Sequence, residues 1–581
     1  MALSAEISSV RCQGKENLAA RPEVSCQASS TAIKTPQSRT KSRPRPDTSA
    51  ATNRMSATHS MVSRMLKYRK AAVTHAIYTA SSSARRRCDG SWTSKATSVP
   101  SNKIGAERRT GTFTVCWDIV LTARRSRNAT GVTGRAMTAN RSPRSRTWFG
   151  VFALAVAVRT VFALITHDTY DYDEFVILLL ARDFAHGAVP YHDFMFFHPP
   201  GILVLYRAIE PLTNIWWPLA RALTIGVDGA TTVLVWRLGK TLYGDHVALF
   251  AGLVYAFSPL ALIASVRVGQ DPVLTLLGML GLWLLVELPS QRTAVIAGIC
   301  LALAVWTKFP ALVFLPVYLL AAPQLFPYVS LSLVSALVAL FAPFAPVHHD
   351  LYYQTVTFQR TRWSMTWGLR LETLALFWLL ANPLALVGLL RTPRSRWLVV
   401  GFALGALFVL SSQVYYHYFV PIGPFAALLS APVVERVVRG SKRVVCMAGV
   451  LLTLCWGGLI DLGGPSPMKV TAAHISDIEP VVTLIDRKTT HAEPILADRF
   501  EYPYLARREP LAHYFWNVGV LVNDRYLERL VHRSSLVVLS YGASSGYPPG
   551  FLTYLDRRYP RLNTRANTVW LIRSKSGSVG G

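Results

Sequence analysis

The residues best suited to chemistry lie in one short stretch near position 170. Asp171-Tyr172-Asp173-Glu174 places three carboxylates within four residues, directly after a long apolar segment. Closely spaced carboxylates repel one another, so one of them is expected to have a raised pKa and to exchange protons, and together they could hold a cation. The pattern indicates a general base beside a membrane. The structural alternative is that Asp173 only caps a helix over 174–186.

Basic side chains follow at the predicted edges of apolar segments. His198 precedes Pro199-Pro200, and a helix that begins there would present free backbone N–H groups to a phosphate. Arg267 and Lys308 stand at predicted external membrane edges, where a buried cation is costly and often functional. Structural alternatives exist for all three: His198 as an interfacial side chain, Lys308 reaching to the interface, and Arg267 paired with Asp271.

Aromatic residues gather at a later membrane edge and in a second external loop. The run Tyr415-Tyr416-His417-Tyr418 follows an apolar block, and the loop 347–371 contains Arg360 and Arg362 among aromatic residues. Aromatic belts are ordinary at membrane interfaces. The functional alternative is a wall that contacts a sugar or prenyl group, with the two arginines contacting a phosphate.

Long apolar blocks are the elements that must position these groups. Apolar residues make up 51% of the 581, and from about Trp148 they cluster in blocks nearly free of charge, which are transmembrane candidates. The blocks run roughly over 148–166, 216–236, 245–264, 272–288, 293–307, 309–323, 327–346, 372–390, 397–412, 418–435 and 444–462.

The positive-inside rule decides whether the shorter apolar piece 199–212 also crosses. If it does not cross, and the N-terminus is inside, the basic clusters at 391–396 and 436–443 both lie on the cytoplasmic side. If it crosses, both clusters move outside. The sequence therefore predicts a multi-pass membrane protein with eleven spans, a cytoplasmic N-terminus and an external C-terminus.

The N-terminal quarter differs from the rest in charge. Residues 1–146 carry 27 of the 61 Lys and Arg but only 7 of the 32 Asp and Glu, without a sustained apolar period. This composition predicts disorder. The segment could be a solvated cytoplasmic extension, the product of a start codon assigned too far upstream, or a tail that binds anionic lipid or nucleic acid.

Three domains follow: a disordered basic extension at 1–146, a transmembrane domain at 147–462 and an external α/β domain at 463–581. The last is predicted as helix 475–488, strand 494–498, helix 522–532, strand 535–541, helix 550–557 and strand 568–573. The seven cysteines contain no C-x-x-C pair, so they predict no metal knot or redox motif.

The order of these motifs resembles the GT-C glycosyltransferases, in the branch of protein O-mannosyltransferases and the lipid A aminoarabinose transferase. One span is followed by an Asp-Glu helix, the segment Gly187 to Asp193, and a basic residue before Pro-Pro. A basic edge residue before Asp271-Pro272, Thr307-Lys308 and a His-Tyr-Phe turn come next, before the α/β domain. The resemblance covers about 148–575.

The resemblance implies a GT-C fold and a transfer reaction. A sugar would pass with inversion from a polyprenyl-phosphate donor to an envelope lipid, glycan or protein acceptor, at the external face of the plasma (inner) membrane. No cofactor is required, although a divalent cation could take part, and membrane lipids are expected partners while nucleic acid is not. The implied sites are Asp173 or Glu174 as the base; His198, Arg267, Lys308, Arg360 and Arg362 at the donor phosphate; and Asp171, Tyr191, Asp193, Asp271, Tyr416, His417 and Tyr418 as further substrate contacts. His198 stands where family members often carry lysine.

Three alternatives compete with this transferase. An oligosaccharide ligase would use a diphosphate-linked donor and would need two or more cation sites. A transporter or flippase of lipid-linked sugars predicts an internal repeat and ionisable groups near mid-bilayer. The blocks place such groups mainly at their edges, with Asp228 as an exception, and no repeat is found. A non-catalytic scaffold whose C-terminal domain binds wall components is the third.

Overall fold

The computed structural model describes residues 147–361, 364–380, 382–391, 395–440, 473–513, 524–539, 549–563 and 568–572. The predicted N-terminal extension, the predicted last span at 444–462 and Arg362 lie outside these described residues.

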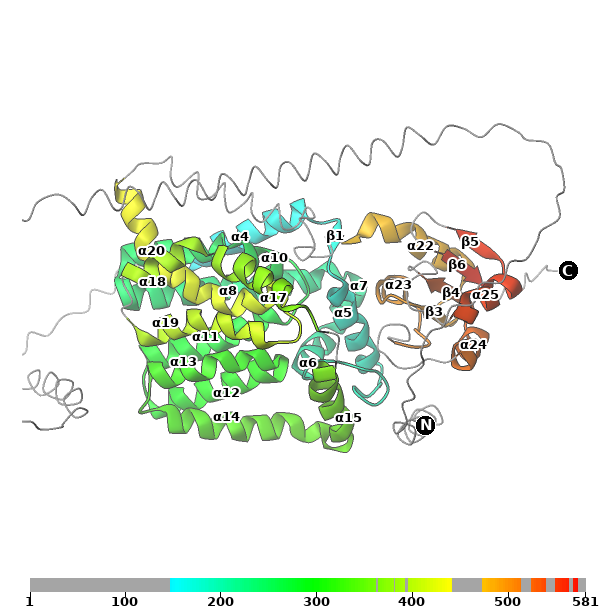
Figure 1. Ribbon diagram of the computed structural model, residues 1–581, viewed down its shortest axis with the longest axis horizontal. Helices are drawn as coiled ribbons and strands as arrows, with labels where there is room; N and C mark the ends of the chain where they lie inside the picture. Colours follow the sequence, from blue (N-terminus) through cyan, green and yellow to red (C-terminus); the bar gives the residue numbers. More distant parts are fainter. Residues whose placement is uncertain are drawn as a thin grey trace, which may run out of the picture. The chain divides into compact units, whose positions relative to one another are not determined.

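Residues 147–440 fold into packed helices (Figure 1). They include α4 (Thr147–Ile165), α8 (Pro218–Tyr243), α9 (Asp245–Ala256), α10 (Pro259–Ser265), α11 (Asp271–Glu287), α12 (Gln291–Thr307), α13 (Phe314–Ala321), α14 (Phe326–Phe341), α18 (Pro383–Arg391), α19 (Arg396–Ala403) and α20 (Gly423–Gly440). Helix α11 packs against both α8 and α12, and α12 packs against α14. Figure 1 shows these helices side by side.

Every predicted apolar block up to 435 falls on helix, but not every block forms one long straight helix. Within the described residues, four helical stretches are long and apolar enough to cross a membrane: Thr147–Ile165, Pro218–Tyr243, Phe326–Arg360 and Tyr416–Arg439. Two bent helix pairs raise that number to six, and other apolar helices are shorter. The predicted count of eleven is therefore higher than length and composition support in the described part of the chain.

Prolines explain part of this difference. Helices α9 and α10 meet at a bend of 56°, where Ser258 precedes Pro259. Proline cannot donate a backbone hydrogen bond, and it disfavours helical geometry in the residue before it. An apolar block read as one span therefore becomes two shorter helices.

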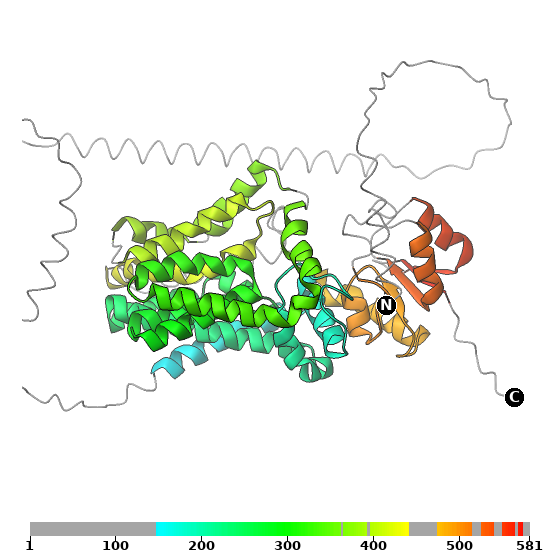
Figure 2. The same ribbon diagram turned by 90° about the horizontal axis from the view of Figure 1, so that it is seen from below.

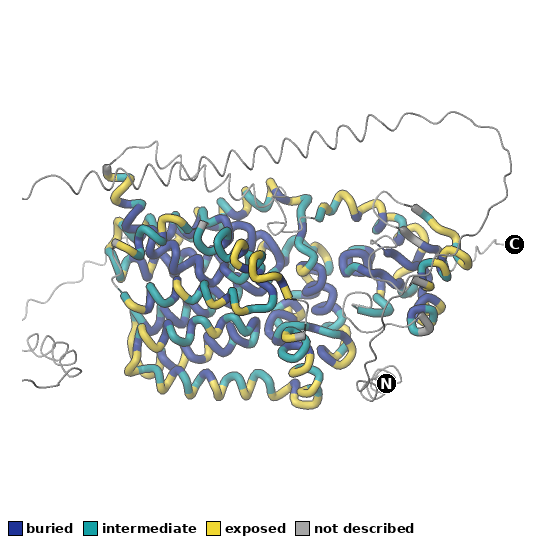
Figure 3. The backbone as a smooth tube through the Cα atoms, in the orientation of Figure 1, coloured by how far each residue is buried: buried dark blue, intermediate teal, exposed yellow. Residues whose placement is uncertain are grey.

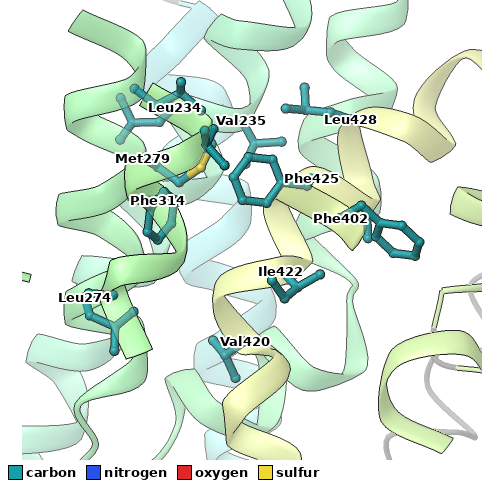
Figure 4. Close-up of a cluster of buried hydrophobic side chains, with 14 of the residues drawn as sticks. Leu234, Val235, Leu274, Met279, Phe314, Phe402, Val420, Ile422, Phe425 and Leu428 are labelled. Carbon is teal, nitrogen blue, oxygen red and sulfur yellow. The ribbon is translucent and has the colours of Figure 1, made fainter. Parts of the chain in front are cut away.

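The core of the helical region is close-packed. Figure 4 shows Leu234 and Val235 of α8 converging with Met279 of α11, Phe314 of α13 and Phe425 of α20. Figure 3 shows exposed backbone along α14, which carries the exposed side chains of Leu331, Val334 and Val338. Such an outward apolar surface is typical of a helix that faces lipid.

The first segment predicted to be external forms the helices that carry the acidic motif. A short strand, β1 (Thr169–Tyr170), leads into α5 (Tyr172–Ala185), which corresponds to the predicted helix 174–186. The predicted half-helix 199–212 is divided at Ile209 into α6 (Gly201–Ala208) and α7 (Glu210–Ile215). The second segment predicted to be external contains α15 (His348–Tyr352), the π-helix η4 (Tyr353–Thr357) and α16 (Phe358–Thr361).

The described residues between 473 and 572 form the predicted α/β unit. Its sheet has the order β3-β4-β6-β5, with β3 (Ile495–Ala497) parallel to β4 (Leu536–Leu539) and both β4 and β5 (Arg561–Asn563) antiparallel to β6 (Thr568–Leu571). The predicted helices appear as α22 (Ile475–Lys488), α24 (Asp524–Arg533) and α25 (Pro549–Arg558). Strand β5 and the short helix α23 (Glu501–Leu505) were not predicted.

The α/β unit contacts the segment that carries the acidic motif. A strand β2 (Ala473–His474) pairs with β1. Helix α23 packs against α5, and Figure 1 shows these two helices next to each other, while Figure 2 shows the orange segment beside the cyan-green one. Tyr170 donates a hydrogen bond to Glu501 Oε1 at 2.6 Å, and Arg182 of α5 donates to the Arg508 carbonyl at 2.9 Å. Tyr170, Glu501 and Arg182 are buried, so the C-terminal unit helps to hold α5.

Candidate active site

A capping box orders the acidic motif. Asp171 is the N-cap of α5: its Oδ1 accepts a hydrogen bond from the Asp173 N–H, while Glu174 Oε1 accepts from the Asp171 N–H at 2.9 Å. This reciprocal pairing satisfies donors that a helix start leaves unpaired. The prediction that Asp173 is the cap was wrong, because the helix begins earlier than expected.

Glu174 points away from solvent into a cluster of donors. Its side chain is 0% exposed and accepts from Arg221 Nε and Nη2, each at 2.8 Å, and from the Val268 N–H at 2.9 Å. Arg267 Nη1 lies 3.6 Å from the same carboxylate. Burial acts to raise the pKa of Glu174, but Arg221, and then Arg267, outweigh it and hold that pKa below its ordinary value. A carboxylate so engaged is a poor base.

One cavity collects most of the predicted site residues. It is lined by Asp171, Asp173, Ile177, His198, Ala264, Arg267, Val268, Gly269, Gln270, Asp271, Pro272, Lys308, Tyr416 and His417. Carboxylates of the α5 N-terminus and cations from the ends of other helices therefore meet in one space.

The acidic side of the cavity holds two carboxylates in different environments. Asp173 is exposed, whereas Asp171 is half-buried and accepts a hydrogen bond from Tyr416 at 3.3 Å. Burial raises the pKa of Asp171, and the nearby Glu174 carboxylate adds to the effect, while the Asp173 N–H, Arg267 and Tyr416 oppose it.

The basic side is set by two helix ends. Helix α12 ends at Thr307, and Lys308, extended and followed by a 3₁₀ turn that contains Pro310, turns into the cavity. Lys308 Nζ lies 3.0 and 2.9 Å from the two carboxylate oxygens of Asp271, which begins α11. Both side chains are buried. The sequence offered Arg267 as the partner of Asp271, and the structure shows Lys308 bound to both oxygens of Asp271.

Arg267 lies between the buried carboxylate and the cavity. It is 3% exposed, donates to Thr169 Oγ1 at 2.6 Å, and lies beside Glu174. It also lines the cavity. A single guanidinium thus contacts the structural carboxylate behind the wall and presents positive charge to the space in front of it.

Several predicted residues lie behind or outside the cavity wall. Tyr191 is buried and donates to the His198 carbonyl at 2.8 Å, so it contacts the backbone of a lining residue. Asp193 accepts from the Val189 N–H at 2.7 Å, on an exposed loop. Arg360 is exposed and is not among the lining residues. Tyr418 does not line the cavity, but its ring contacts a residue that does: the Lys308 Nζ lies 5.1 Å from the centre of the Tyr418 ring.

The sequence reasoning missed Arg221 and the structural role of Glu174, although both left a signal. Arg221 is a lone cation in the apolar block 216–236, and an intramembrane or edge charge is expected to have a partner. Asp171 and Glu174 have the Asp-x-x-Glu spacing of a capping box. Among the residues that the structure describes, no three His, Cys, Asp or Glu side chains are grouped to hold a metal ion.

Comparison with known proteins places this arrangement in a fold class. The family model of dolichyl-phosphate-mannose-protein mannosyltransferase matches residues 198–348. The structure of ArnT from Cupriavidus metallidurans bound to undecaprenyl phosphate is similar over 74% of this chain and 99% of that chain, with 16% identity and a TM-score of 0.53. The chain has the GT-C fold. ArnT in the apo state gives the same identity and coverage, with a TM-score of 0.51.

Other comparisons are more distant. The Archaeoglobus fulgidus oligosaccharyltransferase matches over 72% of this chain with 12% identity and a TM-score of 0.42. No curated protein matches the chain. The GT-C fold confirms the resemblance that the motif order indicates, and with it the predicted class of a polytopic helical membrane protein.

Proposed function

We propose that the chain is a membrane glycosyltransferase that moves a sugar from a polyprenyl-phosphate donor to an envelope acceptor at the external face of the plasma membrane. One observation carries the proposal: a single cavity has the carboxylates of Asp171 and Asp173 on one side and the buried cations Arg267 and Lys308 on the other. The match to the mannosyltransferase model and the GT-C fold shared with ArnT, whose structure holds undecaprenyl phosphate, support the donor class.

In this reaction Asp173 is the general base. It is exposed, lines the cavity, and lies in the first turn of α5, whose N-terminus is held by the capping box and the Arg221–Glu174 pair. Asp173 removes the proton of the acceptor group as that group attacks the anomeric carbon in line with the departing phosphate, which inverts the anomeric configuration. Glu174 has a positioning role, because its oxygens are occupied by donors.

The phosphate of the donor faces the basic side of the cavity. Arg267 and Lys308 are buried, so their charges are less screened than on a surface and favour the negative charge that develops on the leaving phosphate. His198 lines the same cavity and can add a hydrogen bond. Phosphate is a good leaving group, so the proposed reaction requires no metal ion or cofactor.

Substitution of Asp173 tests the proposal. In cells whose only copy of the gene carries Asp173→Asn, sugar transfer should be abolished. A polyprenyl-phosphate sugar should then accumulate, and one envelope glycan should be lost. Mass spectrometry of lipid-linked sugars and envelope glycans measures both. The matched control is Asp171→Asn, which keeps an oxygen that can cap α5.

The outcomes separate the assignments. If Asp173→Asn transfers the sugar fully and Asp171→Asn does not make the envelope glycan, Asp171 is the base instead of Asp173. Deletion of the gene without accumulation of any lipid-linked sugar would remove the glycosyltransferase proposal itself. Membrane fractionation of each variant checks that the protein is present and inserted.

A further inference from the structure

A buried glutamine in the second segment predicted to be external holds the loop that carries His198. Gln354 is 5% exposed and belongs to the π-helix η4. Its Nε2 donates to the Tyr191 carbonyl at 2.8 Å, and its Oε1 accepts from the Phe196 N–H at 2.9 Å. The amide therefore bridges two points of the loop with one donor and one acceptor, and this pairing fixes its orientation.

The bridged loop is under backbone strain that the bridge sustains. Tyr191 has φ 71°, in the left-handed region that a residue with a side chain rarely adopts. Its N–H donates to the Phe194 carbonyl at 3.0 Å, and its hydroxyl donates to the His198 carbonyl at 2.8 Å. Such conformations cost on the order of 1–3 kcal/mol and persist only where surrounding contacts hold them.

Two further side chains of the same segment contact the loop next to His198. Phe358 stacks on Phe197 with ring centres 4.7 Å apart, and Gln359 Nε2 donates to the Phe197 carbonyl at 2.9 Å. The loop from Tyr191 to His198 is thus attached to this segment at several points. Gln354 belongs to the π-helix of this segment, and single π turns are frequent at functional sites.

We propose that Gln354 is a positioning residue that orients His198 toward the donor phosphate. The inference rests on the proposed function, since it takes the cavity that His198 lines as the phosphate site. Gln354 does not itself line the cavity. It acts through the Tyr191 carbonyl and the Phe196 N–H on a loop whose last residue presents the imidazole.

A double-mutant cycle on the purified full-length protein tests this role, with undecaprenyl phosphate as the probe. His198→Ala should weaken binding of the probe about tenfold, as expected for loss of one hydrogen bond to a charged group. Gln354→Leu, which removes the donor and the acceptor at similar volume, should weaken binding several-fold. In the Gln354→Leu variant, the additional substitution His198→Ala should weaken binding by less than about a further twofold, because the misplaced imidazole no longer contacts the phosphate.

The matched control is Thr355→Val in the same π-helix. Thr355 is 4% exposed, and its hydroxyl donates to the Leu351 carbonyl within its own segment, at 2.8 Å, rather than to the loop from Tyr191 to His198. Thr355→Val should bind the probe with the affinity of the wild type, and His198→Ala should weaken binding by the same factor with or without Thr355→Val. Thermal unfolding of every variant in detergent checks that it is folded.

If Gln354→Leu does not fold, Tyr191→Phe takes its place, because it removes only the hydroxyl that contacts the His198 carbonyl. Independent, multiplying effects of His198→Ala and either loop variant would overturn the positioning role. A wild-type affinity in Gln354→Leu would overturn it too. If His198→Ala alone leaves binding unchanged, the phosphate-contact role of His198 fails, and this inference fails with it.

Discussion

The clearest separation of structure from catalysis is expected at two neighbouring carboxylates of α5. Glu174 is fully buried and accepts from Arg221, from the Val268 N–H and from the Asp171 N–H. Asp173 is exposed and lines the cavity. Glu174→Gln should therefore destabilise the protein, whereas Asp173→Asn should leave stability nearly unchanged and remove activity.

The magnitude follows from the contacts that Glu174→Gln breaks. The new amide presents an NH₂ group to at least one of the N–H donors, and the buried Arg221 and Arg267 lose the carboxylate that balances their charge. Removing one partner of a buried ion pair costs about 3–5 kcal/mol. At about 2.1 cal/mol/K of unfolding entropy per residue, a folded part of about 400 residues shifts by roughly 1 °C per kcal/mol, so the unfolding temperature should fall by about 3–6 °C.

Thermal unfolding of detergent-purified protein measures this difference. Asp173→Asn is the control, and it should lie within about 0.5 kcal/mol of the wild type because its side chain is exposed. A Glu174→Gln protein that melts like the wild type yet has no activity would refute the argument. Glu174 would then be a base or substrate contact, and its ion pair would be energetically unimportant.

Acidification should act through the same carboxylate. Because the pKa of Glu174 is lowered in the folded state, its contribution to stability is complete above its ordinary value of 4.5 and is lost as the pH falls through the lowered value. Unfolding curves of the wild type between pH 7 and pH 3 should show this loss. The difference between wild type and Glu174→Gln should shrink over the same range.

Two further predictions concern the cavity wall. Lys308→Ala should weaken the binding of undecaprenyl phosphate about tenfold or more, because it removes a cation that lines the cavity. The control is Asp271→Asn, which keeps the Lys308 cation and should not weaken binding. Equal affinities of the two variants would exclude Lys308 from the phosphate site. Gly201→Ala should lower the free energy of unfolding by about 1–3 kcal/mol, because the added Cβ would lie 2.7 Å from the Trp306 backbone oxygen. The control is Gly226→Ala, whose Cβ would meet nothing within 4 Å and which should not destabilise the protein.

The sequence predicted the site best where a residue type is costly in its setting. A cation at the end of an apolar helix needs a partner or a role, and this argument identified Arg267 and Lys308, which line the cavity. Asp173 followed from the cluster of carboxylates and Asp271 from the resemblance, and both line the same cavity. His198 followed from the Pro-Pro helix start. Helix type and position were also predictable, because long apolar blocks leave few other structures in a membrane.

Side-chain direction was less predictable. Glu174 follows Asp173 directly, so the two side chains point to different sides of a helix, but the sequence does not say which side is buried. Gln354 gave no signal at all, since its inward direction depends on one π turn and on a distant loop. Such contacts join residues more than 150 positions apart, and no local pattern encodes them.

The arrangement also explains how one cavity can serve both halves of the proposed reaction. A phosphodiester donor carries one negative charge, and its phosphomonoester product gains a second as the acceptor loses its proton. If Asp173 takes that proton, it becomes neutral at the moment the phosphate gains charge, so the total charge in the cavity does not change. Negative charge moves from the α5 side to the side of Arg267 and Lys308. Buried cations that are already in place meet it there without reorganisation, which is where electrostatic stabilisation of a transition state is most effective.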